Sequence, residues 1–150
     1  MSSKSRRKPK RTWLMPQELE VWYVLPAIRR EIAMKMIERG RPQKNIAKML
    51  GVTEAAVSQY KLPRSKRSRG DQIEIPDEVQ PEIDKSVDKI LDTWDKVENE
   101  EERSKIYENM THEINRIIKV LRDKGIMCDI HREHCVHVPE DCRACKDGVK

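Results

Sequence analysis

The chain has 150 residues, a mass of 17.7 kDa and a formal net charge of +5, with 38% charged and 37% hydrophobic residues. This length allows one domain or two small ones. So few apolar residues suffice for a small helical core but not for a large buried enzyme cleft. No apolar stretch approaches the roughly 18 residues of a membrane span, and the charged N-terminus lacks the apolar region of a signal peptide. We therefore expect a soluble, cytoplasmic protein with no membrane partner.

The net charge conceals a steep gradient along the chain. Residues 1–70 contain 18 Lys and Arg against 5 Asp and Glu, a net charge of +13, whereas residues 71–150 contain 13 against 21, a net charge of −8. A strongly basic half predicts a polyanionic partner. We expect the acidic half to lie away from the surface that binds this partner.

The N-terminal part of the chain predicts a basic arm followed by two helices. Residues 1–15 are rich in Lys and Arg and have little to bury, so we expect a disordered arm. Helical periodicity begins after Pro16. Pro26 fits the first turn of a second helix better than a helix interior, and Gly40 closes that second helix.

Residues 42–62 are typical of two short helices joined by a tight turn. A helix-turn-helix needs a small residue where its helices meet, a residue that tolerates the turn, and apolar side chains that fix the angle. Here Ala47 is the small residue, Gly51 takes the turn, and Thr53 is a good N-cap for the second helix. The apolar positions that fix the angle are Ile46, Leu50, Val52, Val57 and Tyr60. We predict a helix-turn-helix DNA-binding domain over residues 16–63; the alternative is an ordinary helical hairpin.

The second of these helices is expected to enter the major groove of DNA with its outward face toward the bases. The candidate base-reading residues are Thr53, Glu54, Ala55, Ser58 and Gln59. Basic residues beside them are placed for phosphates, which fix the register of a protein on DNA without reading its sequence. These candidates are Lys44, Lys48, Lys61 and Arg64.

The segment VLPAIRREIAMKMIERGRPQKNIAKMLGVTEAAVSQY (24–60) resembles a family of small archaeal transcriptional regulators with an N-terminal Cro/repressor-like (XRE-type) helix-turn-helix. Its members share a V-L-P-A-x-R opening and an I-A-x-x-L-G-V-T-x-A-A-V-S-Q-Y core. The resemblance covers residues 16–70 closely and the cysteine-bearing C-terminus more loosely, and it implies sequence-specific DNA binding and transcriptional control. Relatives tend to carry a further cysteine pair before the tail, which the segment INRIIKVLR (114–122) lacks.

Beyond this domain the sequence predicts a linker and a helical hairpin. Residues 64–80 begin with the basic stretch RSKRSRG and contain Pro76, so we expect a linker. Over residues 81–125, apolar side chains recur at spacings of four and three, as in a coiled-coil seam. We expect two helices that pack together and against a second copy, giving a homodimer; the alternative is an intramolecular hairpin. The seam positions are Ile83, Val87, Ile90, Trp94 and Val97, then Ile106, Met110, Ile114, Ile117 and Leu121.

Residues 126–150 form a cysteine-rich tail with three of the four histidines. Clustered thiols in an intracellular chain more often bind metal than form disulfides. An iron–sulfur cluster accepts irregular spacing and would use all four cysteines, whereas zinc would use the C-x2-C pair near the end with other ligands. We favour the cluster slightly; two disulfides or a redox-active pair are further alternatives. The candidate ligands are Cys128, Cys135, Cys142 and Cys145, with His131, His134 and His137 beside them.

These features predict an all-α, dimeric transcription regulator that binds double-stranded DNA, is not an enzyme, and senses redox state through a metal centre. One alternative is a zinc-stabilised interaction adaptor in which the helix-turn-helix is only a scaffold. A second is a metal-dependent nucleic-acid enzyme that uses the histidine-rich tail, although the tail offers no constellation of carboxylates beyond scattered loop residues.

Overall fold

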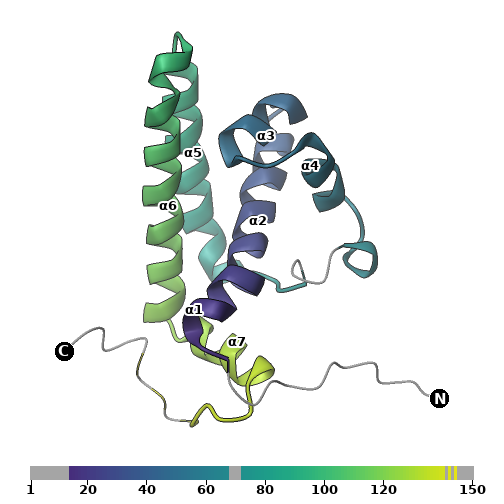
Figure 1. Ribbon diagram of the computed structural model, residues 1–150, viewed down its shortest axis with the longest axis vertical. Helices are drawn as coiled ribbons and strands as arrows, with labels where there is room; N and C mark the ends of the chain where they lie inside the picture. The colour runs from purple at the N-terminus through teal and green to yellow at the C-terminus, as the bar shows by residue number, and fades with distance from the viewer. Residues whose placement is uncertain (1–13, 68–71, 141, 143, 145–150) are drawn as a thin grey trace.

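The computed structural model describes residues 14–67, 72–140, 142 and 144, and this part of the chain consists of helices and loops without a β-strand. The predicted all-α class is therefore confirmed. Figure 1 shows a long hairpin of two helices lying beside a group of shorter helices. The basic arm expected over residues 1–15 falls outside the described residues except at its end, where Leu14 is buried in the core.

The first two predicted helices form one continuous rod. It consists of α1 (Pro16–Leu19), the π-helical turn η1 (Glu20–Val24) and α2 (Leu25–Glu38). Contrary to our expectation, the helix does not end before Pro26. Instead, a π-helical turn lies just before this proline, and in it the Leu25 N–H donates to the Glu20 carbonyl five residues back. A π-helical turn is a common way to carry an irregularity inside a helix, here next to a proline that cannot donate a backbone hydrogen bond.

Two short helices follow, α3 (Gln43–Leu50) and α4 (Glu54–Tyr60), and both pack on α2. Ile46 and Val57 are fully buried between them and α2. In Figure 1, α4 lies on one side of α2 and the long hairpin lies on the other. The C-terminal half of the chain therefore approaches α2 from the side that α4 leaves open.

The segment expected to be a linker over residues 64–80 contributes three side chains to the core. It contains two short 3-10 helices, η2 (Arg64–Lys66) and η3 (Asp77–Val79). Ile73, Ile75 and Val79 are buried, at 9%, 5% and 0% exposure. The prediction rested on the charge and the prolines of the segment and gave too little weight to these three apolar residues.

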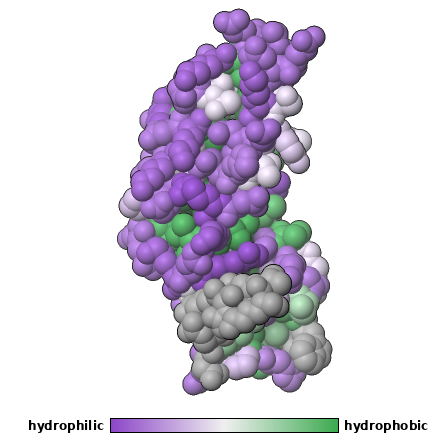
Figure 2. Space-filling model, turned by 90° about the vertical axis from the view of Figure 1, so that its left-hand side faces the viewer, coloured by the Kyte–Doolittle hydropathy of each residue, from purple (hydrophilic) through white to green (hydrophobic). Residues whose placement is uncertain are grey.

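The hairpin itself consists of α5 (Gln80–Lys96), the 3-10 turn η4 (Glu100–Glu102) and α6 (Arg103–Asp123). All ten seam side chains are buried in the core or packed against it. Figure 2 shows the outward side of the hairpin, which is hydrophilic over most of its area. The intramolecular alternative thus accounts for the seam pattern, and formation of a homodimer stays a prediction.

A polar cluster sits between α5 and α6. The fully buried Ser86 hydroxyl donates to the Glu113 carboxylate at 2.7 Å. Arg116 donates to Glu113 (3.1 Å), to Ser86 (2.7 Å) and to the Glu82 carboxylate (2.6 Å). Hydrogen bonds from Arg116 and Lys85 lower the pKa of Glu82. Because buried polar groups that lose their partners are costly, this cluster favours one register of the two helices.

The predicted cysteine-rich tail begins with a helix. Gly125 adopts a left-handed conformation (φ +78°) that ends α6 and starts α7 (Ile126–His134). Ile126, Met127, Cys128 and Ile130 are buried. The Tyr23 and His134 rings lie 4.4 Å apart, and His131 hydrogen-bonds the Leu14 carbonyl, so α7 covers the start of the N-terminal rod. Sequence reasoning focused on the thiols and missed this apolar helix face.

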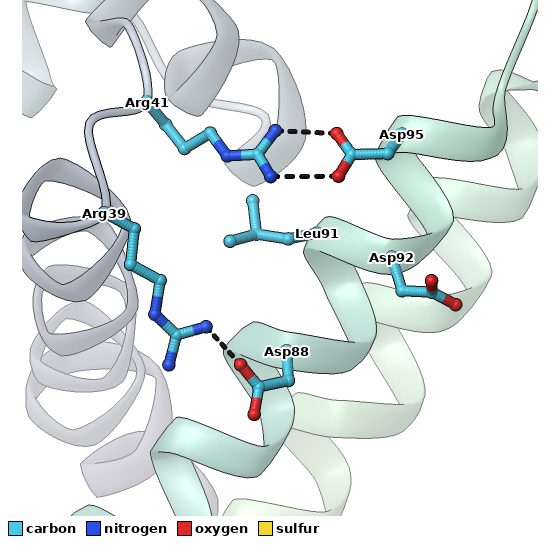
Figure 3. A pocket seen from close by; sticks show the side chains of 6 residues that line it. All are labelled: Arg39, Arg41, Asp88, Leu91, Asp92 and Asp95. Carbon is cyan, nitrogen blue, oxygen red and sulfur yellow. Dashed lines mark hydrogen bonds and ion pairs between the residues drawn. The ribbon is translucent and has the colours of Figure 1, made fainter.

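Ion pairs join the basic and acidic halves on one side of α2. Lys35 contacts Asp84 at 3.0 Å, and Arg39 pairs with Asp84 and Asp88. Arg41 donates two hydrogen bonds to the Asp95 carboxylate, at 2.6 and 2.9 Å (Figure 3). Among the described residues, no helix combines the length and apolar composition needed to cross a membrane.

The burial of Ile75 can be tested by substitution. Ile75→Ala should lower the free energy of unfolding by about 2–4 kcal/mol, because it removes packed methylene groups and leaves a cavity. Glu74→Ala, next to it but exposed, should change stability by less than about 0.5 kcal/mol. Urea unfolding followed by circular dichroism measures both. Equal, negligible effects would mean that the segment is a solvated linker.

The Arg41–Asp95 pair should stabilise the fold in a manner that depends on salt and pH. Asp95→Asn should cost about 0.5–1 kcal/mol at low ionic strength and less in 1 M salt. The control is Asp92→Asn, since Asp92 pairs with Lys96 on its own helix.

The same pair should also make stability depend on pH. Hydrogen bonds from Arg41 lower the pKa of Asp95. The stabilisation is therefore present above the unfolded-state pKa near 4 and is lost as the pH falls through the lower folded-state value. Unfolding curves at several pH values should show the variant and wild type converging in acid.

Candidate nucleic-acid interface

The connection between α3 and α4 has the geometry that the sequence predicted for a sharp turn. Gly51 is left-handed (φ +69°), and the Val52 N–H donates to the Ala47 carbonyl at 3.0 Å. Thr53 caps α4, its hydroxyl accepting from the Ala56 N–H at 3.0 Å. A β-carbon on Gly51 would meet no atom within 4 Å, so the backbone conformation, not crowding, favours glycine there.

All nine candidate DNA-contacting side chains are exposed, and they belong to α3, α4 and the residues that flank α4. Val57 on the opposite face of α4 is fully buried, so the helix presents one polar face outward. The nine exposed residues are Lys44, Lys48, Thr53, Glu54, Ala55, Ser58, Gln59, Lys61 and Arg64.

Gln43 is a residue of this surface that sequence reasoning missed. Its side-chain amide donates to the Ser58 hydroxyl at 2.9 Å, and its amide oxygen accepts from the Lys61 ammonium. It thereby links the first residue of α3 to the C-terminal end of α4. The sequence signal for Gln43 is its position directly after Pro42, where a helix can start.

Not every basic residue near α3 is available to a partner. Arg39 and Arg41, at the connection between α2 and α3, are held by the carboxylates of α5. The Asp95 hydrogen bonds raise the pKa of Arg41. Figure 3 shows both guanidinium groups turned toward carboxylates of α5, with the Leu91 side chain between the two arginines. Lys44, Lys48 and Lys61, by contrast, are exposed, and α4 lies on the side of α2 away from the hairpin.

The acidic hairpin therefore leaves the α4 surface open, in agreement with the expectation from the charge gradient. Arg64 is an intermediate case, because it lies 3.9 Å from the exposed Glu74 carboxylate and its carbonyl accepts from Gln72 at 2.9 Å. Lys66 is exposed as well, on the short helix η2. The positive surface thus continues from α4 into the following segment.

The predicted metal ligands are only partly brought together. Cys128 and Cys135 are buried in or next to α7, and Cys142 is half-buried, while Cys145 lies outside the described residues. In the part of the chain that the structure describes, no three Cys, His, Asp or Glu side chains are arranged to hold a metal ion. Since the fourth candidate ligand lies outside the described residues, the iron–sulfur cluster and the zinc site both stay predictions.

Two of the three histidines beside the cysteines have structural contacts. His131 hydrogen-bonds the Leu14 carbonyl, and His134 hydrogen-bonds the Ile130 carbonyl at 2.9 Å while its ring lies against Tyr23. These contacts join α7 to the N-terminal rod.

Comparison of the chain with protein-family models, with curated proteins and with solved structures finds no match. The interpretation of this surface therefore depends on its own geometry and charge.

The turn at Gly51 gives a prediction for stability. Gly51→Ala should lower the free energy of unfolding by about 1 kcal/mol or more, because an L-residue is disfavoured in the left-handed region. Gly51→Asn should cost less, since asparagine tolerates that conformation. Denaturant unfolding of the two variants measures the difference. Identical stability of both variants and the wild type would show that the turn does not need the left-handed residue.

Proposed function

We propose that the protein is a sequence-specific DNA-binding transcription regulator that inserts α4 into the major groove. The observation that carries this proposal is the polar, exposed face of α4, which projects from a packed two-helix unit on the side away from the acidic hairpin. A short helix held by its buried face and open on its polar face has the shape that major-groove readers use.

The side chains on this face suit direct reading of base edges. Gln59 can donate and accept toward adenine, Glu54 can accept from the cytosine amino group, and Ala55 can contact a thymine methyl group. Ser58 is held by Gln43 at 2.9 Å, so its hydroxyl is oriented before any partner arrives. Preorganised polar groups lose less conformational entropy on binding.

The lysines around the helix suit phosphate contacts. Lys44 and Lys48 lie on α3 and Lys61 follows α4, so they flank the reading face on two sides. Such contacts supply most of the non-specific affinity and make binding strongly salt-dependent. We therefore expect binding through α4 to weaken steeply as the salt concentration rises.

The experiment is a DNA-binding assay at several salt concentrations, with operators selected from a random duplex library. The slope of log K against log salt is negative. Replacing Lys44, Lys48 and Lys61 together by Gln should reduce the magnitude of this slope by about 2–3, since each phosphate contact contributes about 0.9. The matched control replaces three exposed hairpin lysines, Lys85, Lys96 and Lys119, and should leave the slope unchanged.

A second arm of this experiment tests the reading of bases. Gln59→Ala should weaken binding to the selected site by about 1–3 kcal/mol and relax the preference at one position, while non-specific binding stays the same. Loss of affinity that is uniform over all sequences would contradict a base-reading role. Equal sensitivity of both lysine triples, or no duplex binding at all, would contradict the proposed interface and favour the adaptor alternative.

A further inference from the structure

The segment after α7 folds back along that helix and brings residue 142 next to Cys128. The Cys128 sulfur lies 3.9 Å from the Cys142 carbonyl oxygen. Two further contacts hold the same segment in place: Arg132 donates to the Glu140 carbonyl at 2.6 Å, and Val138 packs against the core. A backbone turn, in which the Cys142 N–H donates to the Pro139 carbonyl at 3.2 Å, ends the segment.

We propose that Cys128 and Cys142 form a reversible disulfide that fastens this segment across α7. A carbonyl oxygen lies about 2.4 Å from its own Cα, so the Cys128 sulfur is within roughly 6.3 Å of the Cys142 Cα. A disulfide joins residues whose Cα atoms are at most about 6.8 Å apart, so the contact places the Cys128 sulfur next to the residue it would bond, and rotation of the Cys142 side chain with a shift of its backbone closes the bond.

Exposure sets the order of the chemical steps. Cys142 is half-buried, whereas Cys128 is 4% exposed. The Cys142 thiolate attacks a low-molecular-weight disulfide RSSR, forms a Cys142–S–S–R mixed disulfide and releases RS⁻. The Cys128 thiolate then attacks the Cys142 sulfur and releases the second RS⁻. Overall, two protein thiols are oxidised and one RSSR is reduced to two RSH, and an excess of thiol reverses the exchange.

This pairing differs from the metal centre that the cysteine spacing suggested. A cluster or zinc site needs several donors at one point, and no such group occurs among the described residues. The contact between the Cys128 sulfur and residue 142 involves two cysteines only. A neighbouring pair of cysteines that is free in the reduced chain and exchanges with small thiols is typical of a regulatory or redox-sensing disulfide rather than a permanent one.

The test uses the full chain, reduced, freed of metal by a chelator and then treated with oxidised glutathione. Cleavage after Lys, Arg and Glu places the four cysteines on four peptides, so mass spectrometry assigns every link. We expect the peptide with Cys128 joined to the peptide with Cys142. The bond closes a loop of about 15 residues, which should raise the melting temperature by about 5–10 °C relative to the reduced chain.

Two variants act as a matched pair. Cys142→Ser should abolish both the link and the rise in melting temperature, and Cys145→Ser should keep both; circular dichroism checks that each variant is folded. Three results would overturn the proposal: a main link from Cys128 to Cys135 or Cys145, a stable glutathione adduct on Cys142 with Cys128 still reduced, or stoichiometric zinc or iron in the purified chain that protects both thiols. None of these results depends on DNA binding.

Discussion

The burial of α2 on two sides is the constraint on which the rest of the fold depends. Ala27, Ile28, Ile32, Ala33 and Met36 are all fully buried, and α2 packs on α3 and α4 as well as on the hairpin. A helix with so wide an apolar face needs cover from both directions. The short helices that carry the candidate interface are therefore joined to the C-terminal half by a shared core, and the predicted domain bounds stay a prediction.

The same packing divides the basic residues into two groups with different roles. Lys35, Arg39 and Arg41 contact carboxylates of α5 and help to hold the hairpin on α2. Lys44 and Lys48, only a few residues later, are exposed. A count of charges treats all of these residues as equal, whereas their positions around α2 and α3 show which ones a polyanion can reach.

Local patterns were sufficient for much of this fold. The helical class, the turn at Gly51, the Thr53 cap and the helix end at Gly40 follow from residue-specific backbone preferences, and the sequence predicts them. The packing of Ile75 and the side-chain bridge of Gln43 depend on residues distant in sequence, so no local pattern indicates them. The seam of the hairpin was identified correctly, but periodicity cannot distinguish a partner in the same chain from a second copy, because both present the same apolar surface. The cysteine spacing likewise identifies four candidate ligands but does not indicate which of them the fold brings together.

The hairpin's position opposite α4 also gives the molecule a charge asymmetry in space. Lysines lie around the exposed face of α4, and acidic side chains are concentrated along α5 and η4. Such a separation amounts to an electric dipole. If the protein binds DNA as we propose, the electric field of the duplex exerts a torque on this dipole and turns the α4 side inward before contact, so that fewer encounters are lost to wrong orientations. On that proposal, the acidic hairpin influences the rate of association rather than the sequence that is chosen.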